Sequence, residues 1–221
     1  MTVHMQKEID NVKTKLLNLC AAVEKSLCLA VQAIKDRDSN IAKSVIDNDT
    51  EIDLMEVDLE EECLKILALH QPVAIDLRFL VTALKINNDL ERIGDLAVNI
   101  AERGEYLITQ PAIDFPFDLD AMAQKTQWML TESLDALVDM DAQRAHQVCN
   151  ADDDVDLMHK QAYIKIQDSI VRNPKQIQVY INLVSVSRQL ERIADHTTNI
   201  AEDVIYMVEG RIVRHKAQYK K

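Results

Sequence analysis

The sequence predicts an all-α protein of six long antiparallel helices, arranged as two tandem, similar three-helix bundles. Three observations lead to this fold class. The 221 residues include only three Gly and four Pro, with 4% aromatic residues, and a chain dominated by Leu, Ile, Val, Ala, Glu, Asp and Lys is typical of helical proteins. Apolar residues recur at helical spacing along nearly the whole chain. The second half of the chain also repeats the plan of the first.

The first helix is predicted by apolar residues at positions 16, 19, 20, 23, 27, 30, 31 and 34, the spacing of an amphipathic helix. The segment "DRDSN" interrupts this spacing, and Asp38 or Ser39 can cap a second helix. That helix runs to "LALHQP", where Pro72 cannot continue it but suits the first turn of a third helix. The third helix extends to about Pro111.

The segment "PAIDFPFD" contains two of the four prolines, and we interpret residues 111–119 as a linker between two domains, 1–110 and 120–221. The same plan then recurs. The predicted helices run from about Leu119 to Met140, from about Ala142 to Arg172, and from Pro174 to about Glu209. Trp128 is expected in the core of the fourth helix. A basic tail, "RIVRHKAQYKK", ends the second domain.

Charge and composition exclude several classes of protein. The formal net charge of −12 and a pI near 4.9 argue against a nucleic-acid binder, which needs a basic face to neutralise phosphates. No apolar run approaches the ~20 residues of a membrane span, and the N-terminus has charges where a signal peptide is apolar. The four cysteines form no CxxC pair and sit within helical patterns, so we expect reduced, packed thiols. These features predict a cytoplasmic protein.

The repeat preserves charged residues as well as apolar ones. The segment "DLERIGDLAVNIAE" (89–102) recurs as "QLERIADHTTNIAE" (189–202), and "DTEIDLM" (49–55) recurs as "DDDVDLM" (152–158). Packing of a core accounts for the buried stripe of the third helix but not for the matched acids, which fall on roughly its opposite side. Carboxylates four residues apart repel each other on one helix face, and a bound cation would relieve that repulsion.

Two acidic helices side by side would present one oxygen-rich patch in each half, of the kind that hard cations prefer. The candidate metal ligands are Asp49, Asp53, Glu91, Asp95 and Asn99 in the first half, and Asp152, Asp156, Glu191, Asp195 and Asn199 in the second. Additional candidates are Glu56, His159 and His196, and the two histidines would favour a transition metal. The alternative for each acid pair is a solvated helix face in an acidic protein, and both asparagines can equally be polar surface.

The stretch "PVAIDLRFLVTALKINNDLERIGDLAVNIAE" and its partner "QLERIADHTTNIAE" resemble the PhoU family, over nearly the whole chain. The resemblance implies two similar three-helix bundles, a cytoplasmic and commonly dimeric protein, and no enzymatic activity. It implies a regulator that restrains phosphate uptake and phosphate-starvation gene expression, acting between the transporter ATPase PstB and the sensor histidine kinase PhoR. It also implies metal ions, including multinuclear iron clusters, bound through the E/DxxxD motifs.

We therefore expect a non-enzymatic regulator with surface carboxylate sites for iron, Mn, Mg or Zn. The two sites differ, because Glu56, Glu60 and Leu96 correspond to His159, Tyr163 and His196, which leaves the second site with fewer carboxylates. One alternative is a metalloenzyme, a phosphatase or an oxidase, although the chain has neither the paired Glu-x-x-His motifs of di-iron bundles nor an evident nucleophile. The other alternative is a metal-free helical scaffold.

Overall fold

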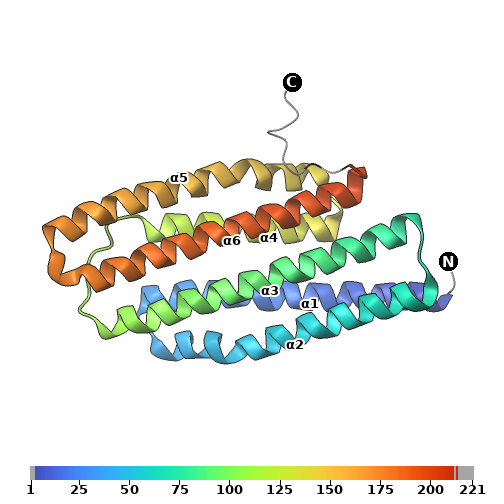
Figure 1. The fold of residues 1–221 in the computed structure, drawn as a ribbon, viewed down its shortest axis with the longest axis horizontal. Helices are drawn as coiled ribbons and strands as arrows, with labels where there is room; N and C mark the ends of the chain where they lie inside the picture. Colours follow the sequence, from blue (N-terminus) through green and yellow to red (C-terminus); the bar gives the residue numbers. More distant parts are fainter. Residues whose placement is uncertain (1–2, 212, 214–221) are drawn as a thin grey trace, which may run out of the picture.

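The computed structural model describes residues 3–211 and residue 213, and it confirms the all-α prediction (Figure 1). The helices are α1 (Val3–Asp36), α2 (Ser39–His70), α3 (Ala74–Thr109), α4 (Leu119–Asp139), α5 (Ala142–Arg172) and α6 (Ile177–Glu209), with a short 3-10 helix, η1 (Pro174–Gln176), before α6. No strand occurs in this described part of the chain. The predicted basic tail, at residue 212 and from residue 214 onward, lies outside it.

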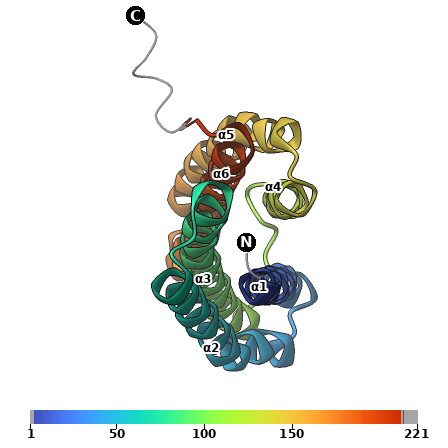
Figure 2. The same ribbon diagram turned by 90° about the vertical axis from the view of Figure 1, so that its right-hand side faces the viewer.

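The helices form two layers (Figure 2). The outer layer follows the order α2, α3, α6 and α5, and α1 and α4 pack on its concave side, α1 against α2 and α3 and α4 against α5 and α6. The antiparallel helices α3 and α6 pack against each other along the middle of the molecule. Residues 110–118 connect the two three-helix bundles outside the helices, while the proposed domain boundaries stay a prediction.

The helix ends follow the sequence closely, with one difference. Asp38 caps α2, accepting hydrogen bonds from the backbone of Asn40 and Ile41, and Asp141 caps α5 in the same way. Pro174 begins η1 as expected, but Pro72 lies before the N-cap Val73 and outside the first turn of α3. A proline disfavours helical backbone at the residue before it, and the chain turns there at Gln71, which has a φ of 46°.

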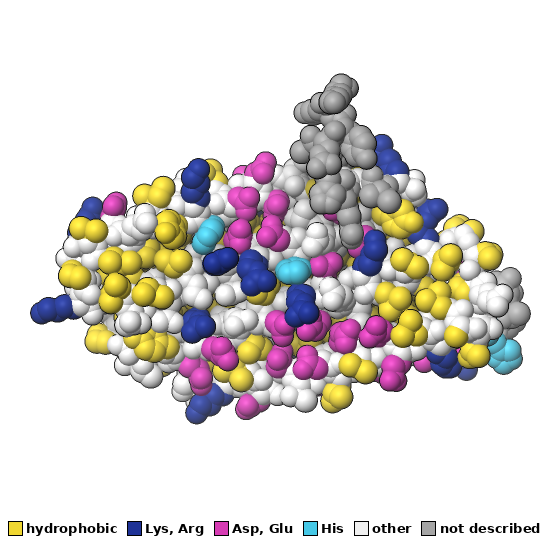
Figure 3. Space-filling model, viewed as in Figure 1, with side chains coloured by type: hydrophobic (Ala, Val, Ile, Leu, Met, Phe, Trp, Pro, Cys, Tyr) yellow, Lys and Arg dark blue, Asp and Glu magenta, His cyan; other side chains and the backbone are white. Residues whose placement is uncertain are grey.

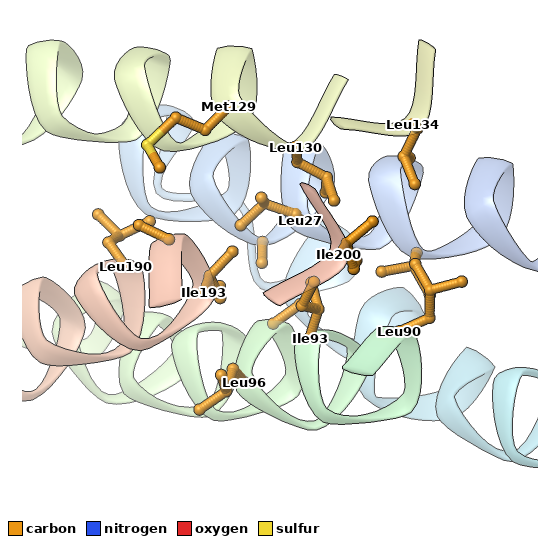
Figure 4. Close-up of a cluster of buried hydrophobic side chains, with 14 of the residues drawn as sticks. Leu27, Leu90, Ile93, Leu96, Met129, Leu130, Leu134, Leu190, Ile193 and Ile200 are labelled. Carbon is orange, nitrogen blue, oxygen red and sulfur yellow. The ribbon is translucent and has the colours of Figure 1, made fainter. Parts of the chain in front are cut away.

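The predicted stripe of α3 lies in the core. Its residues Ile86, Leu90, Ile93, Ala97 and Ile100 are all fully buried, and Figure 4 shows side chains of α1, α3, α4 and α6 meeting there. The placement predicted for Trp128 was wrong, because this side chain is 39% exposed. An indole at the edge of a helix stripe can cover apolar surface without entering the core, so helical spacing alone misplaced it.

Helix α1 differs in one respect from the expectation that no segment resembles a membrane span. Within the described residues, His4–Asp36 is the one helix long and apolar enough to cross a membrane, with a mean hydropathy of 1.4 over its most apolar window. Half of that window is buried inside the bundle, where α1 packs against α2, α3 and α4. The apolar character of α1 therefore matches its position as a core helix.

The cysteines have different surroundings, which predicts an order of reactivity. Cys20 and Cys63 are buried and Cys28 is exposed. Burial raises the pKa of Cys20 to about 12 and that of Cys63 to about 11, and only the thiolate is a good nucleophile. We expect iodoacetamide to alkylate Cys28 first in the native protein and Cys20 last, as measured by peptide mass spectrometry. Equal labelling of Cys20 and Cys28 before denaturation would contradict this placement.

Candidate functional site

The first acid cluster lies where α2 packs against α3. It combines Asp49, Asp53 and Glu56 of α2 with Glu91 and Asp95 of α3. Burial, followed by the charges of Asp53 and Asp95, raises the pKa of Asp49. Burial and then Asp95 raise the pKa of Glu91, to which Glu56 and Asp53 also contribute while Arg92 opposes. The carboxylates of the two helices thus repel one another across the interface, and the residues predicted to form one patch are neighbours.

Gly94 lies where α2 and α3 approach closely at this cluster. A Cβ atom at Gly94 would lie 3.3 Å from Cγ2 of Ile52 and 4.0 Å from Oδ1 of Asp49. That Oδ1 atom is itself buried and has no hydrogen-bond partner among the described residues. An unpaired buried carboxylate oxygen is costly, and a cation beside it would remove the cost.

The second acid cluster repeats this arrangement where α5 packs against α6, with Asp152 and Asp156 of α5 and Glu191 and Asp195 of α6. Burial and then the charges of Asp195 and Asp156 raise the pKa of Asp152 to about 6, although a hydrogen bond with Thr198 opposes the shift. Oδ1 of Asp152 is also buried without a hydrogen-bond partner in the described structure. The same atom is therefore left unsatisfied at the matched position of both halves.

The four helices that carry the clusters, α2, α3, α5 and α6, form the outer layer of the molecule. In Figure 3 the Asp and Glu side chains of the face in view gather in two groups, with Lys, Arg and His side chains between them. Arg92 pairs with Glu91 at 3.3 Å and with Asp95 at 3.1 Å. In the second cluster burial and then the charge of Asp156 raise the pKa of Glu191, and the charges of Arg188 and Arg192 only oppose this shift. These cations are mostly exposed at the rim and offset only part of the repulsion.

The predicted asparagine and histidine ligands do not all face the clusters. Asn99 donates its amide N–H to the backbone oxygen of Asp95 and so stays beside the first cluster. His196 and Asn199 instead contact Asp89 of α3, with His196 Nδ1 at 2.8 Å from its Oδ1 and Asn199 Nδ2 at 3.3 Å. Sequence reasoning missed Asp89, because its burial and its partners on α6 arise from the packing of α3 on α6.

His159 of α5 lies at the α5–α6 interface. Its Nδ1 is 3.0 Å from Oγ of Ser187. Burial, with the charge of Arg188, lowers the pKa of His159 against the opposing effect of Asp156. The imidazole therefore favours the neutral form, the form that binds metal.

The arrangement of these side chains can be compared with what a bound metal ion requires. Among the described residues, no group of three or more His, Cys, Asp or Glu side chains is arranged closely enough to hold one ion. Two other observations favour a hard cation: the matched unsatisfied oxygens of Asp49 and Asp152, and the burial and mutual repulsion that together raise the pKa of the carboxyl groups. The residue types fit an ion that keeps some of its water ligands, without a ready-made cage.

Substitution of Gly94 tests the close contact between α2 and α3. We expect Gly94→Leu to lower the free energy of unfolding by about 1–3 kcal/mol, because the side chain must displace Ile52. Gly94→Ala is the matched control, since the equivalent residue in the second half is Ala194, and a helical alanine recovers up to about 1 kcal/mol. Urea denaturation measures both. If Leu and Ala have the same effect, the contact is not tight.

Comparisons with known proteins agree on the family. The family model described as PhoU domain matches twice, at residues 16–104 and 119–204. The chain is 38% identical to the phosphate-specific transport system accessory protein PhoU homolog of Pseudomonas aeruginosa, with 94% of this chain and 86% of that protein covered. It is 35% identical to the protein of the same description from Aquifex aeolicus, with 95% of each covered.

Solved structures show the same fold. The crystal structure of PhoU from Pseudomonas aeruginosa matches with a TM-score of 0.90 at 37% identity, and the match covers 93% of this chain and 99% of that one. The phosphate transport system regulatory protein PhoU from Streptococcus pneumoniae matches with a TM-score of 0.84 at 26% identity, covering 95% and 99%. The two family-model matches correspond to the two three-helix bundles.

Proposed function

Because this chain belongs to the PhoU family, we propose that it is a non-enzymatic cytoplasmic regulator of phosphate homeostasis. In this proposal it restrains phosphate uptake and phosphate-starvation gene expression by binding both the ATPase PstB of a phosphate ABC transporter and the sensor kinase PhoR. Its relatives are named accessory proteins of phosphate-specific transport systems, which supports a role beside a transporter. The observation that carries the proposal is the match of this family to both halves of the chain.

The acid clusters supply a physical basis for regulated binding. At a formal charge of −12, the protein is suited to basic partner surfaces, and such charge complementarity mainly raises association rates. Ions of iron, Mn, Mg or Zn at the two clusters would be held by Asp49, Asp53, Glu91 and Asp95, and by Asp152, Asp156, Glu191 and Asp195. Bound cations would change the local charge and hence the choice of partner. A homodimer would present four such clusters to its partners.

The regulatory role is tested in a strain that lacks the gene, by following a phosphate-starvation reporter in phosphate-rich medium. We expect the reporter to be active in the deletion strain and repressed again by the wild-type gene. A reporter that stays repressed in the deletion strain would contradict the proposal. Co-purification of the tagged protein with the ATPase and the kinase tests the partners, and retention of neither would overturn that part.

The metal part of the proposal has its own test. Elemental analysis and titration with Mn²⁺ are expected to show bound metal in the wild type and loss of it in Asp49→Asn with Asp152→Asn. The matched control is Asp47→Asn with Asp168→Asn, which removes two exposed acids from the same helices outside the clusters. Absence of metal from the wild type would favour a metal-free scaffold, and equal loss in both double variants would show only a nonspecific effect of charge.

A further inference from the structure

Each position in the first half of the chain can be compared with a matching position in the second half, because the helices of the two halves align residue by residue. The turn after α1 has Arg37 at a φ of 53° and the turn after α4 has Met140 at a φ of 54°. Each is followed by the capping aspartate of the next helix, Asp38 or Asp141. Counting back from these turns, a residue of α1 corresponds to the residue of α4 that is 103 positions later. Buried positions then coincide, for example Leu27 with Leu130.

The two halves differ in the side chains beside the groove between their first two helices. This groove lies between α1 and α2 in the first half and between α4 and α5 in the second. In the second half, Met129 is fully buried and extends from α4 into the core (Figure 4), while Trp128 stays near the surface. Nζ of Lys125 lies 5.0 Å from the centre of the Trp128 ring and 2.9 Å from Oδ2 of Asp154 on α5. Lys125 therefore joins α4 to α5, and the Trp128 ring lies beside it.

The first half lacks these side chains and has a pocket instead. Ala22, Lys25 and Ser26 stand where the second half has Lys125, Trp128 and Met129. A pocket of about 320 Å³ opens between α1 and α2, close to the lower end of the range of small-ligand sites, about 300 Å³. Its apolar lining includes Leu29, Ile52 and Met55.

Two polar groups of this pocket are without partners. Ser26 is 7% exposed and its hydroxyl makes no hydrogen bond in the described structure. Glu51 corresponds to Asp154 but, within the residues that the structure describes, has no counterpart of the Lys125 ion pair, although Lys25 lines the same pocket. A buried hydroxyl without a partner is unfavourable, so a ligand that reaches Ser26 with an N–H group would satisfy it.

We propose that this pocket binds an aromatic side chain, best a tryptophan, flanked by Lys or Arg on a partner polypeptide. The ring would lie on the apolar surface of Leu29, Ile52 and Met55, its indole N–H would donate to Ser26, and the basic side chain would pair with Glu51. These are the groups that Trp128 and Lys125 supply in the other half. Aromatic and basic residues are also the side chains that most often dominate protein interfaces.

The pocket is separate from the acid clusters. Asp49 and Asp53 of α2 interact with carboxyl groups of α3, whereas Glu51 and Met55 line the groove that α2 shares with α1. Ile52 lies between the two, lining the groove and also approaching Gly94 of α3. A partner bound there leaves the clusters open to cations. Failure of aromatic binding would leave the metal result unchanged, so the two proposals fail independently.

The test uses the full-length protein and a peptide, acetyl-Lys-Ala-Ala-Trp-amide, which carries the spacing of Lys125 and Trp128. We expect amide chemical-shift changes in NMR spectra to concentrate on α1 and α2 around Ala22 and Met55. A peptide without the tryptophan should not bind, and one without the lysine should bind more weakly. Shift changes spread over the whole surface, or centred on α4 and α5, would overturn the proposal.

Two variants block the pocket with residues that the second half already uses. Ser26→Met fills the position of Met129, and Ala22→Lys provides Glu51 with the ion pair that Asp154 has. Each is expected to weaken peptide binding about tenfold or more. Ala22 is only half-buried, so Ala22→Lys keeps the test valid if Ser26→Met does not fold. Glu61→Gln, an exposed change on α2 outside the pocket, is the control. Unchanged binding by Ala22→Lys would overturn the proposal.

Discussion

Metal-free protein will unfold at a higher temperature at a pH of about 5.5 than at about 7.5, opposite to the behaviour of carboxylates that are stabilised by ion pairs. Folding raises the pKa of Asp49, Glu91, Asp152, Glu191 and Asp195, so the folded state binds protons more readily than the unfolded one. These five groups therefore increase stability as the pH falls through their folded pKa values, and they outnumber opposing groups such as His159, whose pKa folding lowers. The gain stops growing below the unfolded values, 3.8 for Asp and 4.5 for Glu.

The size of this effect follows from Asp152, whose folded pKa is about 6. After a discount for solvent screening, this group alone contributes about 0.5 kcal/mol between the two pH values, which corresponds to a rise of about 1–2 °C in melting temperature. Asp152→Asn should remove part of the pH dependence and stabilise the metal-free protein at neutral pH, while Asp168→Asn should do neither. Differential scanning calorimetry in the presence of a chelator measures this, and a melting temperature that falls between pH 7.5 and 5.5 in the wild type would contradict it.

Asp89→Ala will lower the free energy of unfolding by about 2–4 kcal/mol, because it leaves polar groups of α6 without their partner. Asp89 is 7% exposed and contacts both His196 and Asn199 across the middle of the molecule. A double-mutant cycle with His196→Ala should give a coupling energy of about 1–2 kcal/mol. Urea denaturation measures the free energy of unfolding of the wild type, of the two single variants and of the double variant.

Gln189→Ala is the control for this prediction. Gln189 holds the matching position on α6, and its Oε1 is buried without a hydrogen-bond partner in the described residues. Removal of an unsatisfied oxygen should change stability by less than about 1 kcal/mol. Additive effects of Asp89→Ala and His196→Ala would show that their contact contributes nothing to the joining of the two halves.

The sequence was sufficient for most of the helices, because the signals for their ends are local. Asp38 and Asp141 cap helices, and the break between α3 and α4 falls in the proline-containing segment. The acid pairs could be predicted too, since helical spacing places Asp49 with Asp53 and Glu91 with Asp95. The prediction that each pair has a partner on the next helix came from the repeat and the family resemblance, and the packing of α2 on α3 agrees with it.

Other features depend on contacts that spacing within one helix does not contain. The contact of Asp89 with His196 joins residues from different halves of the chain, and it requires the antiparallel packing of α3 on α6. Because of this contact His196 and Asn199, predicted as ligands, face Asp89. The exposed Trp128 was misplaced for a related reason, since helical spacing identifies a stripe but not which neighbour covers its edge.

The contact between Asp89 and His196 also distinguishes a fused repeat from a symmetric dimer. In an assembly of two identical three-helix chains, any pair across the twofold axis occurs twice. This chain has the pair once, since the matching positions hold Gln189 and Leu96. Covalent linkage of the two copies thus allows the sequence of one half to change independently of the other. A single chain can then hold two different halves in one fixed arrangement.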